Sequence, residues 1–338
     1  MNDFRSDNTH GASAEILEAM ARINSGTFTS YGQDPLTARV RDRLRGIFET
    51  DCEVLPVLTG TAGNALSVAA LTPPWGGVFC HEDAHIHRDE MGAPEFFSGG
   101  AKLFPIAGAN GKLDRDSLAT AIDKIANEGR TATPACVSLT QATEAGTMYS
   151  VDELRVLCDV AHQRGCRVHM DGARFANAVV ASGASPADLT WRAGVDVLVL
   201  GATKNGALAA EMIVMFDKSL AAEMNTRWHR GGHRASKMRF LSAQFDAYLS
   251  DDLWLRNARR ANEMAARLAA GMTEVLQPVD ANVVFARLGP DVLARLRARG
   301  FLFYDWPLFG DGAVRFVCGF TTTEAEVDAL LGALQSGR

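Results

Sequence analysis

The chain of 338 residues has few of the features that mark membrane, secreted or nucleic-acid-binding proteins. Its longest apolar runs are about strand length, well short of the ~20 residues that a membrane-spanning helix needs. The first eleven residues, MNDFRSDNTHG, carry charges and no apolar signal-peptide core. The net charge is −6 and neither end carries a basic arm, so we expect no attraction to nucleic acid or anionic lipid.

Cysteine is scarce and scattered, with six residues and no C-x-x-C pair. In a chain without a secretion signal, such cysteines are expected to be reduced and mostly buried, so we expect a cytoplasmic protein. No repeat, low-complexity run or Pro/Ser-rich linker interrupts the sequence. A chain of this length is too long for a single small domain and suits one large α/β domain followed by a smaller domain.

Short apolar runs alternate with amphipathic helical segments, a pattern typical of a mostly parallel sheet flanked by helices. Ser150 and Glu153 have capping-box spacing and predict the start of a helix that ends near Gly165. A second helix is predicted to begin near Thr61. Strands are predicted at residues 54–58, 77–80, 135–139, 166–170 and 195–200.

The pattern changes after about residue 240. Long helices rich in Arg, Ala and Leu precede strand-like runs at residues 281–288 and 313–318. We therefore predict an N-terminal segment and large domain at residues 1–240, and a small C-terminal α+β domain at 241–338.

Ligands of open α/β sheets bind where loops leave the carboxyl ends of the strands, so the residues just past each predicted strand are the candidates. The run GTAGN at 60–64 joins a strand to a helix. Glycine lets the backbone approach an anion, and the helix start offers unpaired N–H groups, which favours a phosphate site. A plain tight turn is the alternative. The run is not a P-loop motif, which argues against a nucleoside triphosphate.

Two charged residues follow other predicted strands. Asp171 ends the strand at 166–170, where a buried carboxylate needs a partner. That partner is either a protonated pyridine nitrogen of pyridoxal phosphate (PLP) or the nearby Arg174. Lys204 lies four residues after the apolar strand at 195–200. Burial favours the neutral amine that forms Schiff bases, although a surface lysine of no special role fits the position too.

The three elements are more specific together than alone. A phosphate loop, an aspartate at a strand end and a lysine after the next strand is the order expected of fold-type I PLP enzymes. The cluster of histidines and carboxylates at residues 81–87 raises the alternative of a metal-dependent lyase. No strand or helix register aligns three of those groups on one face, so we predict no metal site and expect one histidine to stack on the cofactor.

Motifs along nearly the whole chain resemble the L-threonine aldolase family of fold-type I PLP enzymes, and most of all its low-specificity L-threonine aldolases and L-phenylserine aldolases. The matching runs are SDN at 6–8, YGQD at 31–34, GTAGN at 60–64, AH at 84–85, GAPEFF at 92–97, HMDGAR at 169–174, GATKNG at 201–206 and ASKMRF at 235–240. The resemblance implies an aspartate aminotransferase-like fold whose large domain holds a mostly parallel, seven-stranded sheet. It also implies a homotetramer, built as a dimer of dimers with shared sites.

The resemblance also implies a role for each matching residue. Lys204 binds PLP covalently, Asp171 pairs with the pyridine nitrogen, and His85 stacks on the ring and serves as a base. The phosphate is held by Gly60 and Thr61, with Arg234 or Lys237 reaching the phosphate of a neighbouring subunit. The remaining substrate-binding residues are Ser6, Arg174 and Arg315 for the carboxylate, and Tyr31 across a subunit boundary.

The sequence departs from many members of that family at one point. They carry a second active-site histidine after the strand at 135–139, whereas this chain reads Thr-Gln-Ala-Thr-Glu at 140–144. His85, or a water that it orients, therefore becomes the expected base, with Glu144 next in line.

The activity expected from the resemblance is reversible cleavage of L-threonine, L-allo-threonine or a relative such as L-phenylserine to glycine and an aldehyde. Competing hypotheses are another fold-type I enzyme, such as an aminotransferase or a β-eliminating lyase, and a binding protein of the same fold without catalysis.

Overall fold

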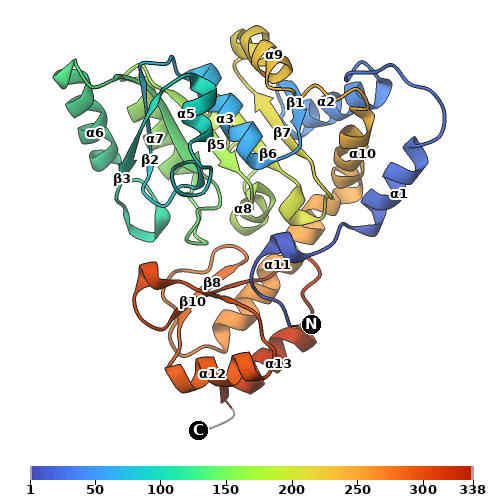
Figure 1. Cartoon of the computed structure of the whole chain (residues 1–338), viewed down its shortest axis with the longest axis vertical. Helices are drawn as coiled ribbons and strands as arrows, with labels where there is room; N and C mark the ends of the chain where they lie inside the picture. The colour runs from blue at the N-terminus through green and yellow to red at the C-terminus, as the bar shows by residue number, and fades with distance from the viewer. Residues whose placement is uncertain (1, 336–338) are drawn as a thin grey trace.

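Two β-sheets divide the chain into a large and a small domain, as Figure 1 shows for the computed structural model, which describes residues 2–335. The strands of the large sheet lie in the order β1-β7-β6-β5-β4-β2-β3. Five neighbouring strands run parallel, while β7 runs antiparallel to both β6 and β1. Their bounds are β1 Glu53–Val57, β2 Gly76–His81, β3 Lys102–Ile106, β4 Thr133–Thr140, β5 Arg167–Gly172, β6 Val197–Gly201 and β7 Glu211–Met215. The predicted α/β fold is confirmed.

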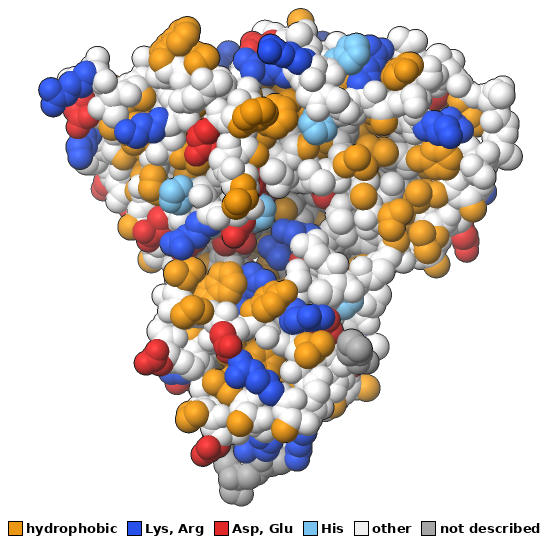
Figure 2. All heavy atoms as spheres, in the orientation of Figure 1, with side chains coloured by type: hydrophobic (Ala, Val, Ile, Leu, Met, Phe, Trp, Pro, Cys, Tyr) orange, Lys and Arg blue, Asp and Glu red, His pale blue; other side chains and the backbone are white. Residues whose placement is uncertain are grey.

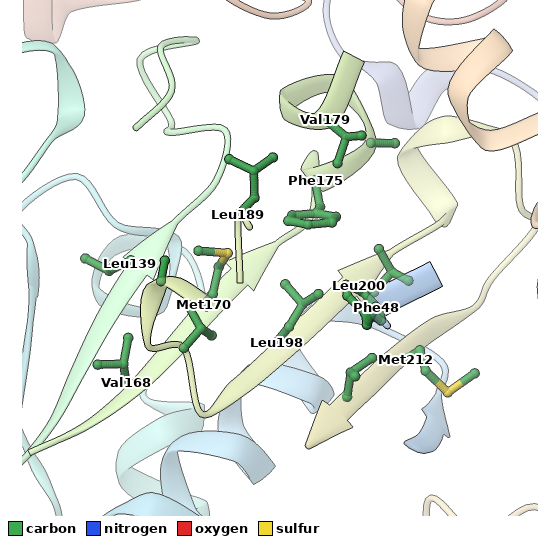
Figure 3. Packing of buried hydrophobic residues seen from close by; sticks show 14 of the residues in the cluster. Phe48, Leu139, Val168, Met170, Phe175, Val179, Leu189, Leu198, Leu200 and Met212 are labelled. Carbon is green, nitrogen blue, oxygen red and sulfur yellow. The ribbon is translucent and has the colours of Figure 1, made fainter. Parts of the chain in front are cut away.

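Helices cover both faces of this sheet. Leu198 and Leu200 of β6 pack into a core with Phe175 of α8, shown in Figure 3, while Val199 points to the opposite face and approaches α3. The large-domain helices are α1 Ala14–Ile23, α2 Pro35–Phe48, α3 Gly60–Leu71, α4 His85–Arg88, α5 Ala93–Ser98, α6 Arg115–Glu128, α7 Val151–His162, α8 Phe175–Ser182, α9 Ala221–Arg230 and α10 Arg239–Tyr248. The predicted capping box is confirmed at the start of α7, where Ser150 and Glu153 bond each other's backbone.

The small domain is a three-stranded antiparallel sheet covered by helices. Its elements are β8 Val283–Arg287, α12 Pro290–Ala298, β9 Tyr304–Asp305, β10 Ala313–Val317 and α13 Glu324–Gln335. Phe4, from the start of the chain, is buried in the core of this domain. The N-terminal segment thus reaches the small domain before the chain enters the large one.

The helix α11, Leu253–Ala270, joins the two cores. Trp254 and Ala258 near its start belong to the large-domain core, whereas Met264 and Leu268 belong to the small-domain core. The α10 helix also packs in the large-domain core through Phe245 and Tyr248. The domain boundary near residue 240 remains a prediction.

The six cysteines are buried and unbridged within the described chain, as predicted. None of the helices in residues 2–335 is both long and apolar enough to cross a membrane.

Candidate active site

Several of the predicted site residues gather at one edge of the large sheet because of strand direction. The carboxyl ends of β5 and β6 lie side by side there, and β1, which also runs antiparallel to β7, ends at the same edge. The antiparallel strand β7 begins at this edge, where Glu211 pairs with Gly201 and Val57. Asp171, Lys204 and the start of α3 are thereby brought together from distant parts of the sequence.

The start of α3 presents backbone N–H groups to this edge. Thr59 caps the helix by accepting a hydrogen bond from the backbone of Ala62 at 3.1 Å. A Cβ added to Gly63 would lie 2.6 Å from Val199, so glycine is what lets α3 pack directly on β6. A Cβ added to Gly60 would meet nothing within 4 Å, so open space faces the first turn. The geometry suits an anion at Gly60 and Thr61.

Asp171 is buried, and its side chain lies on the face of the sheet that α3 covers. It accepts hydrogen bonds from Asn64 Nδ2 at 2.9 Å and from the backbone N–H of Ala173 at 3.0 Å. Arg174, the alternative ion-pair partner, binds Asp7 instead. Because each carboxylate oxygen has a second lone pair, Asp171 retains the capacity to accept a further proton donor from the cavity.

His85, the first residue of α4, is held by a buried carboxylate. Its Nδ1 lies 2.8 Å from Oε1 of Glu90, and the same oxygen accepts a hydrogen bond from Asn64 at 2.8 Å. The hydrogen bond to Glu90 raises the pKa of His85, and burial raises the pKa of Glu90. With Nδ1 occupied, only Nε2 of His85 remains to contact a ligand. Asn64 links this pair to Asp171 in one continuous network.

Lys204 lies between two adjoining cavities. The inner cavity, about 290 Å³, is lined by Gly60, Thr61, Asn64, Asp171, Thr203, Lys204 and Glu211, among others. The outer cavity, about 590 Å³, is lined by Ser6, His85, Glu144, Arg174, Lys204, Tyr304, Trp306 and Arg315, among others. Figure 2 shows basic, acidic and histidine side chains gathered where the two domains meet. Lys204 and His85 line both cavities, so a group bound in one is within reach of a group bound in the other.

The segment that carries Lys204 is anchored by the residue that follows it. Asn205 donates hydrogen bonds to the hydroxyl of Tyr248 and to the carbonyl of Trp254, both at 2.8 Å. These contacts tie the turn between β6 and β7 to α10 and α11. The position of the Lys204 backbone is therefore set by buried contacts.

Two arginines define the outer cavity. Arg174 donates from Nε and Nη2 to Asp7 at 2.7 and 3.0 Å, which leaves Nη1 for another acceptor. Burial alone would raise the pKa of Asp7, but Arg174, Lys204 and hydrogen bonds lower it to about 2. Burial and the like charge of Arg174 lower the pKa of Arg315, and Nε of Arg315 has no hydrogen-bond partner within residues 2–335. Two close guanidinium groups with unused donors fit an anion such as a carboxylate.

The other residues expected at the site lie elsewhere in the same chain. Tyr31 and Arg234 line a separate cavity of about 440 Å³, where the guanidinium of Arg234 lies 5.7 Å from the centre of the Tyr31 ring. Lys237 is exposed nearby and lines none of these cavities. These three do not meet Lys204 within one chain.

The predicted residues leave four important neighbours unnamed: Asp7, Asn64, Glu90 and Glu211. Asp7 lies within the SDN motif at 6–8 and Asn64 within the GTAGN motif at 60–64, so both motifs pointed to them. Glu90 is five residues after His85, beyond the short helix α4. Glu211 is the only charged residue of β7. A single acid in an otherwise apolar strand is the sequence feature that could have indicated a site residue.

Ligand atoms of His85, Glu90 and Asp171 lie within 4.8 Å of one another, a spacing that could hold a metal ion. However, hydrogen bonds already join His85 to Glu90 and, through Asn64, Glu90 to Asp171. The residues fit PLP better: N–H groups for a phosphate, a carboxylate for a pyridinium and an amine for an aldehyde surround one cavity.

Known proteins resemble this chain over nearly its whole length. The sequence is 45% identical to the low specificity L-threonine aldolase of Pseudomonas aeruginosa over 324 residues, which cover 94% of this chain and 93% of that protein. It is 41% identical to that of another Pseudomonas species, covering 98% and 97%. The structure of Leishmania major threonine aldolase superposes with a TM-score of 0.92 at 26% identity, covering 98% of both chains. Residues 3–288 match the family described as "Beta-eliminating lyase", and the chain therefore belongs to the beta-eliminating lyase family.

Proposed function

We propose that this protein is a PLP-dependent aldolase that reversibly cleaves L-threonine, L-allo-threonine or related β-hydroxy-α-amino acids, such as L-phenylserine, to glycine and an aldehyde. One observation carries the proposal: Lys204 stands between a cavity that suits PLP and a cavity with two arginines that suits an amino-acid carboxylate. The likeness to two low specificity L-threonine aldolases over more than nine-tenths of the chain supports this choice among PLP reactions.

Substrate binding is the work of the outer cavity. Arg174 and Arg315 bind the carboxylate, and Ser6, which lines the same cavity, adds a hydroxyl. Asp7 fixes the side chain of Arg174 through two hydrogen bonds. Arg174 therefore loses little conformational freedom when the substrate binds. The orientation of the carboxylate determines which bond of the substrate Cα is turned toward the inner cavity.

Proton transfer is the work of His85. Glu90 accepts from Nδ1–H of His85, which leaves the lone pair of Nε2 facing the cavities as the acceptor for the β-hydroxyl proton, directly or through a water. Glu144 lines the outer cavity and is the next candidate. When bound at Lys204, PLP supplies the electron sink for the electrons of the broken Cα–Cβ bond. Asp171 would accept a hydrogen bond from the protonated pyridine nitrogen of PLP and so keep that nitrogen protonated.

We further infer that the enzyme acts as a homotetramer, a dimer of dimers with shared sites, in the cytoplasm. Tyr31, Arg234 and Lys237 match the family motifs but lie apart from the cavities at Lys204 of their own chain. A partner's site is where such residues can act. Mixing Tyr31→Phe and Lys204→Ala proteins under conditions of subunit exchange should restore some activity. A fully active monomer in light scattering would refute the shared site.

Product analysis tests the proposed reaction. Incubation of the PLP-loaded enzyme with threonine, allo-threonine and phenylserine should release glycine and one equivalent of aldehyde, unaffected by a metal chelator. A keto acid with ammonia would identify a β-eliminating lyase. A keto acid without ammonia, limited to about one equivalent per enzyme because no keto acid is present to accept the amino group, would identify an aminotransferase. No turnover despite a yellow PLP complex would identify a binding protein, and loss of activity with chelator would identify a metal-dependent lyase.

A further inference from the structure

Glu211 is a buried carboxyl group in the inner cavity that the proposed mechanism does not use. It is the first residue of β7 and lies opposite Gly201 of β6 and Val57 of β1. Its side chain lines the same cavity as Gly60, Thr61 and Lys204. Only 6% of the residue is exposed. It is the only charged residue in the otherwise apolar strand β7.

The contacts of Glu211 hold it against the turn that carries Lys204. Its Oε2 accepts a hydrogen bond from the backbone N–H of Ala202 at 2.9 Å. Burial raises the pKa of Glu211 to about 7, although this hydrogen bond, the neighbouring Thr203 and the charge of Lys204 oppose the rise. The group therefore exchanges its proton in the pH range in which enzymes work.

A phosphate bound at the start of α3 would place two negative charges in this cavity of about 290 Å³. A carboxylate in the same cavity would be repelled by them, and poor screening inside the protein strengthens that repulsion. A protonated carboxyl group meets no such repulsion and offers a hydrogen-bond donor.

We propose that Glu211 is a neutral acid of the cofactor-phosphate site, which takes up a proton when the phosphate group of PLP binds. The proposal rests on the phosphate position at Gly60 and Thr61 that the proposed function assumes. Its consequence is that affinity for the phosphorylated cofactor falls as pH rises above neutrality, because the apoenzyme has by then lost the proton that the complex needs.

Other charged groups face Glu211 from the neighbouring elements, and none of them reverses this direction. Lys204, after β6, favours the carboxylate, whereas Asp171 of β5 favours the neutral acid. Tyr248 of α10 stays protonated, since burial raises the pKa of its hydroxyl.

The experiment compares two ligands on two proteins. Apoenzyme and its Glu211→Gln variant are titrated with PLP and with pyridoxal, which lacks the phosphate, between pH 6.5 and 8.5. For PLP, the Kd of the parent should rise by about tenfold per pH unit above neutrality relative to the variant, as uptake of one proton requires. For pyridoxal, parent and variant should show the same pH dependence. Asp196→Asn, which removes a carboxylate at the opposite end of the neighbouring strand β6, should behave like the parent.

Calorimetry provides a measurement that does not depend on the variant folding. Titration of parent apoenzyme at pH 8 in buffers of different ionisation enthalpy should show proton uptake with PLP that pyridoxal does not cause. Equal uptake for both ligands, or equal pH dependence of PLP binding in parent and Glu211→Gln protein, would overturn the proposal. Borohydride labelling of the same samples separates this failure from that of the site itself: a label on Lys204 leaves the proposed function standing, and a label elsewhere does not.

Discussion

Most residues around the inner cavity lie near the ends of strands in one sheet, whereas the outer cavity combines parts of the chain that are more than 300 residues apart. Asp171, Lys204 and Glu211 are placed by strand direction and register. Ser6, Arg174 and Arg315 come from the N-terminal segment, the large domain and the small domain in turn. We infer that the sheet positions the groups that bind and activate the cofactor, while residues at the junction between the domains bind the substrate.

The two cavities also differ in how their charges are balanced. In the inner cavity, Asp171, Asn64, Glu90 and His85 form one hydrogen-bonded network. In the outer cavity, Arg315 has an unpaired, buried Nε and stacks at 4.5 Å on the ring of Trp306. A complete hydrogen-bonded network fixes the geometry before a ligand binds, whereas the buried Nε of Arg315 gains a partner only when a ligand binds. Variants of the two cavities should therefore fail in different ways.

The largest effect is expected for His85, which belongs to both cavities. His85→Asn should lower kcat for threonine cleavage by roughly 10²–10⁴-fold, the range of general-base catalysis, while PLP still binds at Lys204. His87→Asn, on the exposed side of the same short helix, is the control and should keep parental kcat. His85→Phe preserves ring stacking without a proton acceptor. Near-parental kcat in that variant would move the base role to Glu144 or to a water.

Asp171 tests the inner cavity alone. Asp171→Ala should lower kcat by about 10²–10³-fold, because the partner of the pyridine nitrogen is lost, with a smaller change in KM. Asp196→Asn changes a carboxylate at the opposite edge of the sheet, where it contacts His162 and Arg167, and should leave kcat unchanged in correctly folded protein. If kcat of Asp171→Ala stays within about tenfold of the parent, Asp171 has only a structural role.

Arg315 tests the outer cavity alone. Arg315→Ala should raise KM and lower kcat/KM by about 10–100-fold, since a charge-assisted hydrogen bond contributes roughly 1.5–3 kcal/mol. The absorption spectrum with PLP should not change, because the inner cavity is intact. Arg287→Ala, on the neighbouring strand β8 and paired with Glu274, serves as the control. Loss of PLP binding in Arg315→Ala would show that Arg315 also supports the cofactor and that the two cavities do not have separate roles.

The smallest effect is expected for Glu90, which should change the pH profile more than the rate. The hydrogen bond to Glu90 raises the pKa of His85, so the base is protonated up to a higher pH than a free histidine. Activity should rise with pH as His85 loses its proton. Glu90→Gln should shift this rise in kcat/KM to lower pH and change the maximal rate by less than about tenfold. An unshifted profile would show that Glu90 does not control the protonation of His85.

Residues of the inner cavity were predictable from the sequence, because ligands of open α/β sheets bind at the carboxyl ends of strands. That rule found Gly60, Asp171 and Lys204, which lie at or just past the carboxyl ends of β1, β5 and β6. It missed Glu211 because β7 is antiparallel and begins, rather than ends, at this edge. It also gave no individual prediction for β3, whose five residues include Lys102 and Pro105 and lack the apolar run of the other strands.

The substrate-binding residues of the outer cavity were predicted only from the family resemblance. Nothing in local spacing connects Ser6 with Arg315, since their proximity depends on how the N-terminal segment packs into the small domain through Phe4. The buried Arg174–Asp7 pair was likewise invisible, because Arg174 had a nearer carboxylate in sequence, Asp171. Long-range packing decides between such partners, and sequence periodicity carries no information on it.

The attachment of PLP at Lys204 is the most direct test of the difference between the cavities. Holoenzyme is reduced with borohydride, digested and mapped by mass spectrometry. We expect the pyridoxyl label on the peptide containing Lys204, in nearly every labelled chain, and no specific label in Lys204→Ala protein. A label on Lys237 or any other lysine, with Lys204 unmodified, would contradict this expectation.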